Sequence, residues 1–137
     1  MERTVLVCED DPAMVRIFQF LLRQQGIRNV FTTGNGEKII PLAIQHKPSL
    51  ILLDLMLPGK DGLSVLRDLK DKDETRSIPV IVVSGKESQE QVQQAMLAGA
   101  IDYVIKPFEP MELGGRIKNF LDTLTPSTTL ESGGPSS

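Results

Sequence analysis

Five short apolar runs alternate with longer segments of helical periodicity, and this alternation constrains the fold more than any other feature. The runs are TVLVC (4–8), NVFTT (29–33), SLILLD (49–54), PVIVVS (79–84) and DYVIK (102–106). Strands that alternate with helices build a parallel sheet from strand–helix–strand units. The third and fourth runs are almost continuously apolar, which is typical of central strands covered on both faces. The pattern therefore predicts an α/β fold with a doubly wound parallel sheet.

The segments between the runs carry the start and stop signals of helices. In the first of them, Asp11 can cap the N-terminus, Pro12 suits the first helical position, and Gly26 can supply the left-handed residue past the end. Asp61 is expected to cap the third helix in the same way. The predicted helices are 12–25, about 36–46, about 62–71, 88–98 and 110–123.

Two of these helices contain residues that disfavour a helix interior. Pro41 lies inside the pattern EKIIPLAIQ, so the second helix should either kink or start late. Gly114 and Gly115 should weaken the fifth helix by roughly 2 kcal/mol relative to two alanines. Neither feature argues against the predicted fold.

The bulk properties of the chain restrict its class. Its 137 residues suit one domain with one core, and 40% hydrophobic and 24% charged residues are ordinary values for a globular protein. A net charge of −3 provides no electrostatic basis for direct nucleic-acid binding. No run approaches the ~18 apolar residues of a membrane span, and the N-terminus lacks the apolar segment of a signal peptide. We expect a cytoplasmic protein without membrane contact, in which the single cysteine, Cys8, is an inert core thiol.

Chemically active side chains follow four of the five predicted strands. In a flavodoxin-like (βα)5 sheet of order 2-1-3-4-5, ligands bind at the carboxyl ends of the strands, where the chain reverses direction between strands 1 and 3. Strand 1 is followed by Glu9 and Asp10, strand 3 ends in Asp54, strand 4 ends in Ser84, and strand 5 ends in Lys106. These acids, the hydroxyl and the ammonium should therefore meet at one edge of the sheet.

Phosphoryl transfer is the chemistry that such a set of groups supports. Carboxylates together with backbone and water oxygens form the hard, oxygen-rich site that Mg²⁺ prefers. Asp54 is suited to attack phosphorus, since carboxylates form acyl phosphates. Lys106 would balance charge on the transferred group, and Ser84 would donate a hydrogen bond to it. Without the other strands, Glu9 and Asp10 would indicate only a solvated loop.

The same segments resemble the receiver domains of two-component response regulators. The resemblance covers about residues 3–123 and rests on LVCEDDP, LLDLMLPGKDG, VVSG and DYVIKPF, in this order and at these spacings. It implies that Asp54 accepts a phosphoryl group from a phosphohistidine on a sensor histidine kinase or phosphotransfer protein. It further implies a receiver domain over residues 1–124, with 125–137 as a flexible Ser/Thr/Gly/Pro-rich tail or a truncated interdomain linker.

The resemblance also implies a metal site and positions that set the lifetime of the phosphorylated state. Glu9, Asp10, Asp54 and the backbone carbonyl of Met56 would hold Mg²⁺, or Mn²⁺ in its place. Glu9 departs mildly from the family pattern, in which Asp is commoner. Met56 and Lys86 match positions that tune dephosphorylation in the family.

A conformational switch is the last feature that the resemblance implies. The bond between Lys106 and Pro107 would be cis, which places the lysine. Tyr103 would turn inward as Ser84 moves toward the phosphoryl group, and a partner or output domain would read the change on the face of helix 4, strand 5 and helix 5. The structural alternative is that Tyr103 is an edge-strand residue half-covered by the fourth helix.

Other functional classes fit the sequence less well. A flavodoxin needs a hydroxyl- and glycine-rich loop after strand 1 to cradle phosphate, whereas here that loop is EDDP. An aspartate-nucleophile phosphatase would carry its nucleophile on strand 1 and would need a cap for which 137 residues leave little room. We therefore expect a phosphoacceptor domain with intrinsic phosphotransfer and self-dephosphorylation chemistry, and not an enzyme.

Two interpretations of the output stay open at the level of sequence. The chain is either a stand-alone receiver that acts by protein contact or the input half of a longer regulator, and homodimerisation on phosphorylation is a third undecided point. The only histidine, His46, lies in the polar segment QHKP. We expect it to be exposed and assign it no part in phosphoryl transfer.

Overall fold

The computed structural model describes residues 3–85 and 88–124 of the chain. Lys86 and the predicted tail, 125–137, lie outside the described residues. Strands and helices alternate as predicted, with strand ends within one residue of the expected positions. The elements are β1 (Thr4–Cys8), α1 (Pro12–Gln24), β2 (Asn29–Thr33), η1 (Gly36–Lys38), α2 (Ile39–His46), β3 (Leu50–Leu53), α3 (Gly62–Asp71), β4 (Val80–Ser84), α4 (Gln89–Leu97), β5 (Asp102–Ile105) and α5 (Pro110–Leu124).

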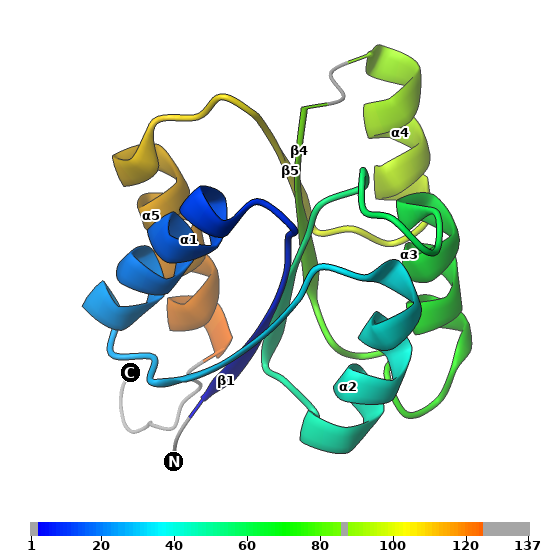
Figure 1. Cartoon of the computed structure of the whole chain (residues 1–137), viewed down its shortest axis with the longest axis horizontal. Coiled ribbons are helices and arrows are strands. Elements are labelled where there is room, and N and C mark those ends of the chain that lie inside the picture. Colours follow the sequence, from blue (N-terminus) through cyan, green and yellow to red (C-terminus); the bar gives the residue numbers. More distant parts are fainter. Residues whose placement is uncertain (1–2, 86–87, 125–137) are drawn as a thin grey trace.

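All five strands are parallel and lie in the order β2-β1-β3-β4-β5. Helices α1 and α5 cover one face of the sheet, and α2, α3 and α4 cover the other, so the molecule has three layers (Figure 1). This confirms the α/β fold that the alternation of runs predicts and the flavodoxin-like strand order 2-1-3-4-5 that we expected. The direction of the connections reverses between β1 and β3, which lie side by side at the centre of the sheet.

Successive strand residues contribute to opposite layers of the core, because side chains alternate across a pleated strand. The strand residues under α2, α3 and α4 are Leu6, Cys8, Ile51, Leu53, Val80, Val82 and Tyr103. Those under α1 and α5 are Val5, Val7, Leu50, Leu52, Ile81, Val83 and Val104. The central strands are therefore buried on both faces, which explains their continuous apolar runs.

The start of α1 separates one acid from its two neighbours. The Asp11 carboxylate accepts a hydrogen bond from the amide of Ala13 at 3.0 Å, and Pro12 is the first helical residue. After the helix, Gly26 adopts φ +82°, the left-handed conformation that glycine tolerates best. Both ends of α1 are thus the ones predicted from the sequence.

The second helix starts late, which is one of the two outcomes expected from Pro41. Residues 36–38 form the short 3₁₀ helix η1, and α2 begins only at Ile39. Pro41 is then the third residue of α2, where a backbone N–H has no intrahelical acceptor and its loss costs little. The proline thereby accounts for the late start of α2, which spans Ile39–His46.

The remaining helices follow their predicted positions closely. The Asp61 carboxylate caps α3 by accepting from the amide of Ser64 at 3.1 Å. Helix α5 runs unbroken across Gly114 and Gly115, and its buried side packs on α1. No helix in the described part of the chain has the length and apolar character needed to cross a membrane.

The expectation that His46 is exposed is wrong. Its ring is partly buried and stacks on Phe31 of β2, with ring centroids 3.6 Å apart and an interplanar angle of 16°. The end of α2 returns over the edge strand and brings the two rings together, which the polar local sequence around His46 could not indicate.

Candidate metal and phosphoryl-transfer site

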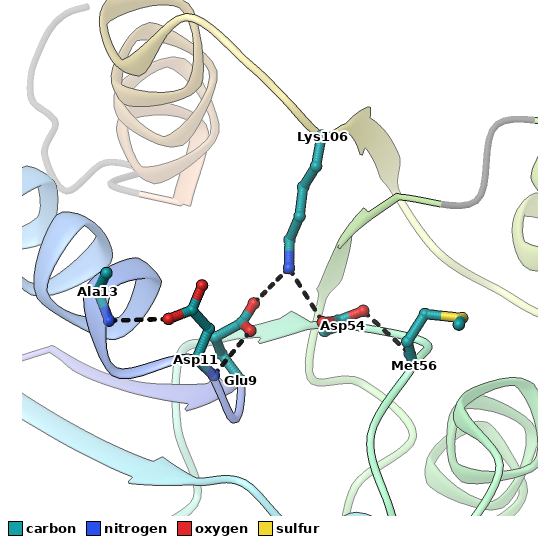
Figure 2. Close-up of polar contacts among 6 residues, drawn as sticks. All are labelled: Glu9, Asp11, Ala13, Asp54, Met56 and Lys106. Atoms are coloured by element: carbon teal, nitrogen blue, oxygen red, sulfur yellow. Dashed lines mark hydrogen bonds and ion pairs between the residues drawn. The ribbon is translucent and has the colours of Figure 1, made fainter.

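The residues predicted to meet at the carboxyl ends of the strands lie together in the structure. One carboxylate oxygen from each of Glu9, Asp10 and Asp54 lies within 4.8 Å of the others. Lys106 extends from the end of β5 between Glu9 and Asp54 and contacts both (Figure 2). Four strands contribute to this edge because they are parallel and therefore end on the same side.

Glu9 is the most buried of the three acids, at 3% exposed. Its Oε1 lies 2.7 Å from the Lys106 ammonium, and its Oε2 accepts a hydrogen bond of 3.1 Å from the amide of Asp11. Burial raises the pKa of Glu9, and the hydrogen bonds from Lys106 and from the Asp11 backbone offset only part of that rise. A further cation close to Glu9 would therefore stabilise the ionised form of its carboxylate.

Asp54 occupies the first position after β3 and is 6% exposed. Its backbone amide donates to the carbonyl of Cys8 at 3.0 Å, which ties the position to the end of β1. Its Oδ1 accepts from the amide of Met56 at 2.9 Å, and its Oδ2 lies 3.0 Å from the ammonium of Lys106. The carboxylate is therefore held in one orientation at the end of the central strand (Figure 2).

Asp10 is the exposed member of the acidic group. Its neighbour Asp11 is directed toward the start of α1, so only two acids of the EDD run belong to the group (Figure 2). Three carboxylates against the single ammonium of Lys106 leave an excess of negative charge in a small volume. An all-oxygen, anionic donor set of this kind fits Mg²⁺ or Mn²⁺.

Lys106 is the cation of the site. Burial alone would lower the pKa of Lys106, but its hydrogen bonds to Glu9 and Asp54 and their negative charges outweigh burial and raise it. The ammonium therefore stays protonated. The Lys106–Pro107 peptide bond is cis, the isomer that the resemblance implies.

Ser84 and Tyr103 form a second polar pair beside the acids. Ser84 is fully buried at the end of β4, and Tyr103 is 9% exposed on the neighbouring strand β5. A side-chain hydrogen bond joins the two residues. Burial raises the pKa of Tyr103, the bond with Ser84 lowers it in part, and the charge of Asp54 raises it further. The alternative in which α4 leaves Tyr103 half-covered therefore does not fit its burial.

Met56 and Lys86 are the two remaining positions that the sequence analysis assigned to the site. Met56 bonds to Asp54 through its amide, while its side chain points outward and is 57% exposed. Lys86 lies outside the described residues. The sequence analysis missed the ion pair between Lys106 and Glu9, which lie 97 residues apart. It also gave no role to Thr33, whose carbonyl accepts the Glu9 amide at 2.9 Å. Only the tertiary structure shows either contact.

A three-layer α/β sheet with an acidic, cation-attracting group at its switch point defines the class of this protein. Residues 5–118 match the response regulator receiver domain family. The chain therefore belongs to the family of response regulator receiver domains.

Solved structures of receiver domains are similar to this chain over nearly their whole length. The receiver domain of the sensor histidine kinase PA1611 from Pseudomonas aeruginosa, with magnesium coordinated in its active-site cleft, matches at TM-score 0.78 and 27% identity over 89% of this chain and 99% of that one. The BeF₃-activated receiver domain of Klebsiella pneumoniae RstA matches at 0.78 and 28% identity over 87% and 98%. The Mn²⁺-bound response regulator Rcp1 matches at 0.73 and 25% identity over 95% and 99%.

Proposed function

We propose that this chain is the phosphoacceptor domain of a two-component system and that Asp54 is the residue that becomes phosphorylated. The observation that supports this most directly is the position of Asp54. It is a buried acid directly after the central strand β3, 3.0 Å from the Lys106 ammonium, oriented by the Met56 amide and grouped with Glu9 and Asp10. The donor would be a phosphohistidine on a sensor histidine kinase or phosphotransfer protein.

In the proposed transfer, an Asp54 carboxylate oxygen forms a bond to phosphorus in line with the donor. The P–N bond of the phosphohistidine breaks, and its electron pair stays on the imidazole nitrogen. Lys106, already beside Asp54 Oδ2, would balance the charge of the transferred group, and the Ser84 hydroxyl would donate to one of its oxygens. The product is an aspartyl phosphate, so the domain is consumed as a substrate in each transfer.

Glu9, Asp10, Asp54 and the Met56 carbonyl are the groups that would hold Mg²⁺ or Mn²⁺. A cation bound there would offset the charge of the carboxylates and let an anionic phosphoryl group approach Asp54. The magnesium ion in the receiver domain of PA1611 and the Mn²⁺ in the response regulator Rcp1 support this choice of cation.

The phosphorylated state would be read through Ser84 and Tyr103. Their existing hydrogen bond gives a physical link between the phosphoryl site and β5, and the readout face would be formed by α4, β5 and α5. Phosphorylation shifts this face only to the extent that it stabilises one arrangement more than another. A partner protein or an output domain would bind there. Residues 1–124 would constitute the domain, with 125–137 as tail or linker.

Phosphorylation by a small-molecule donor tests the proposal. With Mg²⁺ and acetyl phosphate, the intact chain should gain about 80 Da, the mass of one phosphoryl group. Asp54→Asn should abolish the gain. Asp11→Asn is the matched control, because it makes the same chemical change two residues from Glu9 and Asn still caps a helix. If Asp54→Asn is phosphorylated at the unchanged rate, the assignment of Asp54 as the acceptor is wrong. Steady turnover of unrelated phosphomonoesters would indicate a phosphatase instead.

A further inference from the structure

A short segment that runs from the end of β2 into η1 contacts both loops that carry the acids of the site. Within residues 33–37, hereafter the brace segment, the carbonyl of Thr33 accepts a hydrogen bond of 2.9 Å from the amide of Glu9. The next residue, Gly34, lies against Asp10 so closely that a Cβ there would be 3.1 Å from both the Cα and the Cβ of that acid. The brace segment therefore supports the β1–α1 loop at Glu9 and Asp10, the two acids of this loop that belong to the site.

The other side of the brace segment supports the loop that follows Asp54. The amide of Gly36 donates to the carbonyl of Pro58 at 2.8 Å. A Cβ on Gly36 would lie 2.5 Å from the backbone oxygen of Lys60, closer than real Cβ atoms approach. The side chain of Asn35 lies against Gly59, where a Cβ would be 2.2 Å from the Asn35 Oδ1. The β3–α3 loop is thus in backbone contact with the brace segment.

Hydrogen bonds within the brace segment and from the adjacent Lys38 fix the conformation of its backbone between the two loops. The Asn35 Oδ1 accepts from the amide of Glu37 at 2.9 Å, and the Asn35 amide donates to the Thr33 hydroxyl at 3.2 Å. The Asn35 carbonyl in turn accepts from the amide of Lys38 at 3.0 Å. The segment is therefore held by its own hydrogen bonds as well as by its contacts with the two loops.

We infer that the brace segment is a positioning element for the metal site. Together with the direct pairing of β1 and β3, it sets the separation between the β1–α1 loop, with Glu9 and Asp10, and the β3–α3 loop, with Asp54 and Met56. This inference rests on the proposed metal-binding role of those residues. The physical reason is that Mg²⁺ accepts little deviation from octahedral geometry, so an error of about 0.5 Å between two ligand loops weakens binding.

Metal titration of the full chain tests the inference, with calorimetry of Mg²⁺ and Mn²⁺ binding as the readout. Gly36→Ala forces its new Cβ against the Lys60 backbone, and Gly34→Ala forces its Cβ against Asp10. Both should weaken metal binding by about tenfold or more, as outer-shell changes do at other metal sites. Gly36→Ala should cause the larger loss of affinity, because its Cβ would lie 2.5 Å from the Lys60 oxygen, against 3.1 Å from Asp10 for Gly34→Ala.

Gly99→Ala is the matched control. Gly99 has φ +115°, and a Cβ there would lie 2.8 Å from the Lys70 side chain, so the substitution strains the fold. It precedes β5, at the opposite edge of the sheet from the acids. Gly99→Ala should lower the free energy of unfolding yet leave metal affinity unchanged.

The outcomes separate this inference from the proposed function. If the unmodified chain binds neither metal, the proposed metal site is wrong. If the unmodified chain binds and both brace variants bind equally well, the inference is overturned while the proposed function stands. Equal losses of affinity in Gly99→Ala and the brace variants would also overturn it, since destabilisation alone would then explain the effect. If Gly36→Ala does not fold, Gly34→Ala, with its milder 3.1 Å contact, decides the matter.

Discussion

At the scale of single residues, Lys106 holds the position that a bound cation would share. Its ammonium lies 2.7 Å from Glu9 and 3.0 Å from Asp54, and its pKa is raised, so it remains charged. A metal ion and this ammonium are attracted by the same two carboxylates. Under the proposed function, Lys106 would therefore have opposite effects on two properties, since it would oppose metal binding and support phosphoryl transfer.

Replacement of Lys106 should separate these two properties. Lys106→Met removes the competing charge, so Mg²⁺ should bind severalfold more tightly, because like charges repel within a poorly solvated site. The same variant should accept the phosphoryl group from acetyl phosphate at least about tenfold more slowly, since transition-state charge loses its counterion. Calorimetry and intact-mass kinetics measure the two quantities.

Lys118→Met provides the control for that variant. Lys118 pairs with Asp122 on the exposed side of α5, and both side chains are 61% exposed. Neither metal affinity nor phosphorylation should change. Weaker Mg²⁺ binding in Lys106→Met would contradict the competition between ammonium and metal.

Tyr103 allows a direct measurement, because it is the only tyrosine and the chain has no tryptophan. Its pKa is raised above the ordinary value of about 10, chiefly by burial. Ultraviolet titration of the folded chain should therefore show a phenol midpoint above 10, which falls to about 10 in denaturant. The folded state binds the phenolic proton more tightly than the unfolded state, so stability should fall as pH rises through that window. A folded-state midpoint at or below 10 would show that Tyr103 is solvated.

At the scale of elements, the two glycines inside α5, Gly114 and Gly115, lower the stability of this helix. The sequence analysis treated Gly114 and Gly115 alike, but their surroundings differ. A Cβ on Gly115 would meet nothing within 4 Å, whereas one on the buried Gly114 would lie 3.4 Å from the Leu21 side chain of α1. The two glycines thus have the same low helix propensity, but only Gly114 is packed against α1.

Gly115→Ala should raise the free energy of unfolding by about 0.5–1 kcal/mol, because alanine loses less backbone entropy than glycine in a helix. Urea unfolding monitored by circular dichroism measures the change. Gly114→Ala is the paired comparison and should gain less, since its methyl group must fit against α1. A destabilised Gly115→Ala would mean that this surface of α5 is covered in the native state.

At the scale of the whole molecule, the parallel sheet brings like charges to one edge. Glu9 and Asp54 come from adjacent strands, and Asp10 completes the acidic group. Lys106 offsets part of the repulsion among these acids, and the remaining excess of negative charge costs stability unless a further cation is bound.

Addition of Mg²⁺ should therefore stabilise the fold. At about ten times the Kd, binding to the folded state alone adds about 1.4 kcal/mol to the free energy of unfolding. Thermal unfolding in MgCl₂, compared with NaCl at the same ionic strength, measures the gain. Asp10→Asn should reduce it, and Asp61→Asn, which retains the α3 cap, should not. Equal stabilisation by the two salts would show general screening and no specific site.

Local physics made much of this molecule predictable from sequence. The continuous apolar runs identify central strands, and the caps at Asp11 and Asp61 follow from short-range hydrogen bonds. The late start of α2 follows from the missing N–H of Pro41. The gathering of Glu9, Asp10 and Asp54 at one edge follows from the fold class, because parallel strands end on the same side.

Tertiary structure alone decided the contacts between residues distant in the chain. It paired Lys106 with Glu9, stacked His46 on Phe31, and joined Ser84 to Tyr103. The contacts depend on sheet register and on where a helix or loop returns to the sheet. The sequence by itself thus determined which groups reach the site, and packing determined which of them touch. A residue pattern encodes local periodicity and end signals, whereas these distances arise only when the layers assemble.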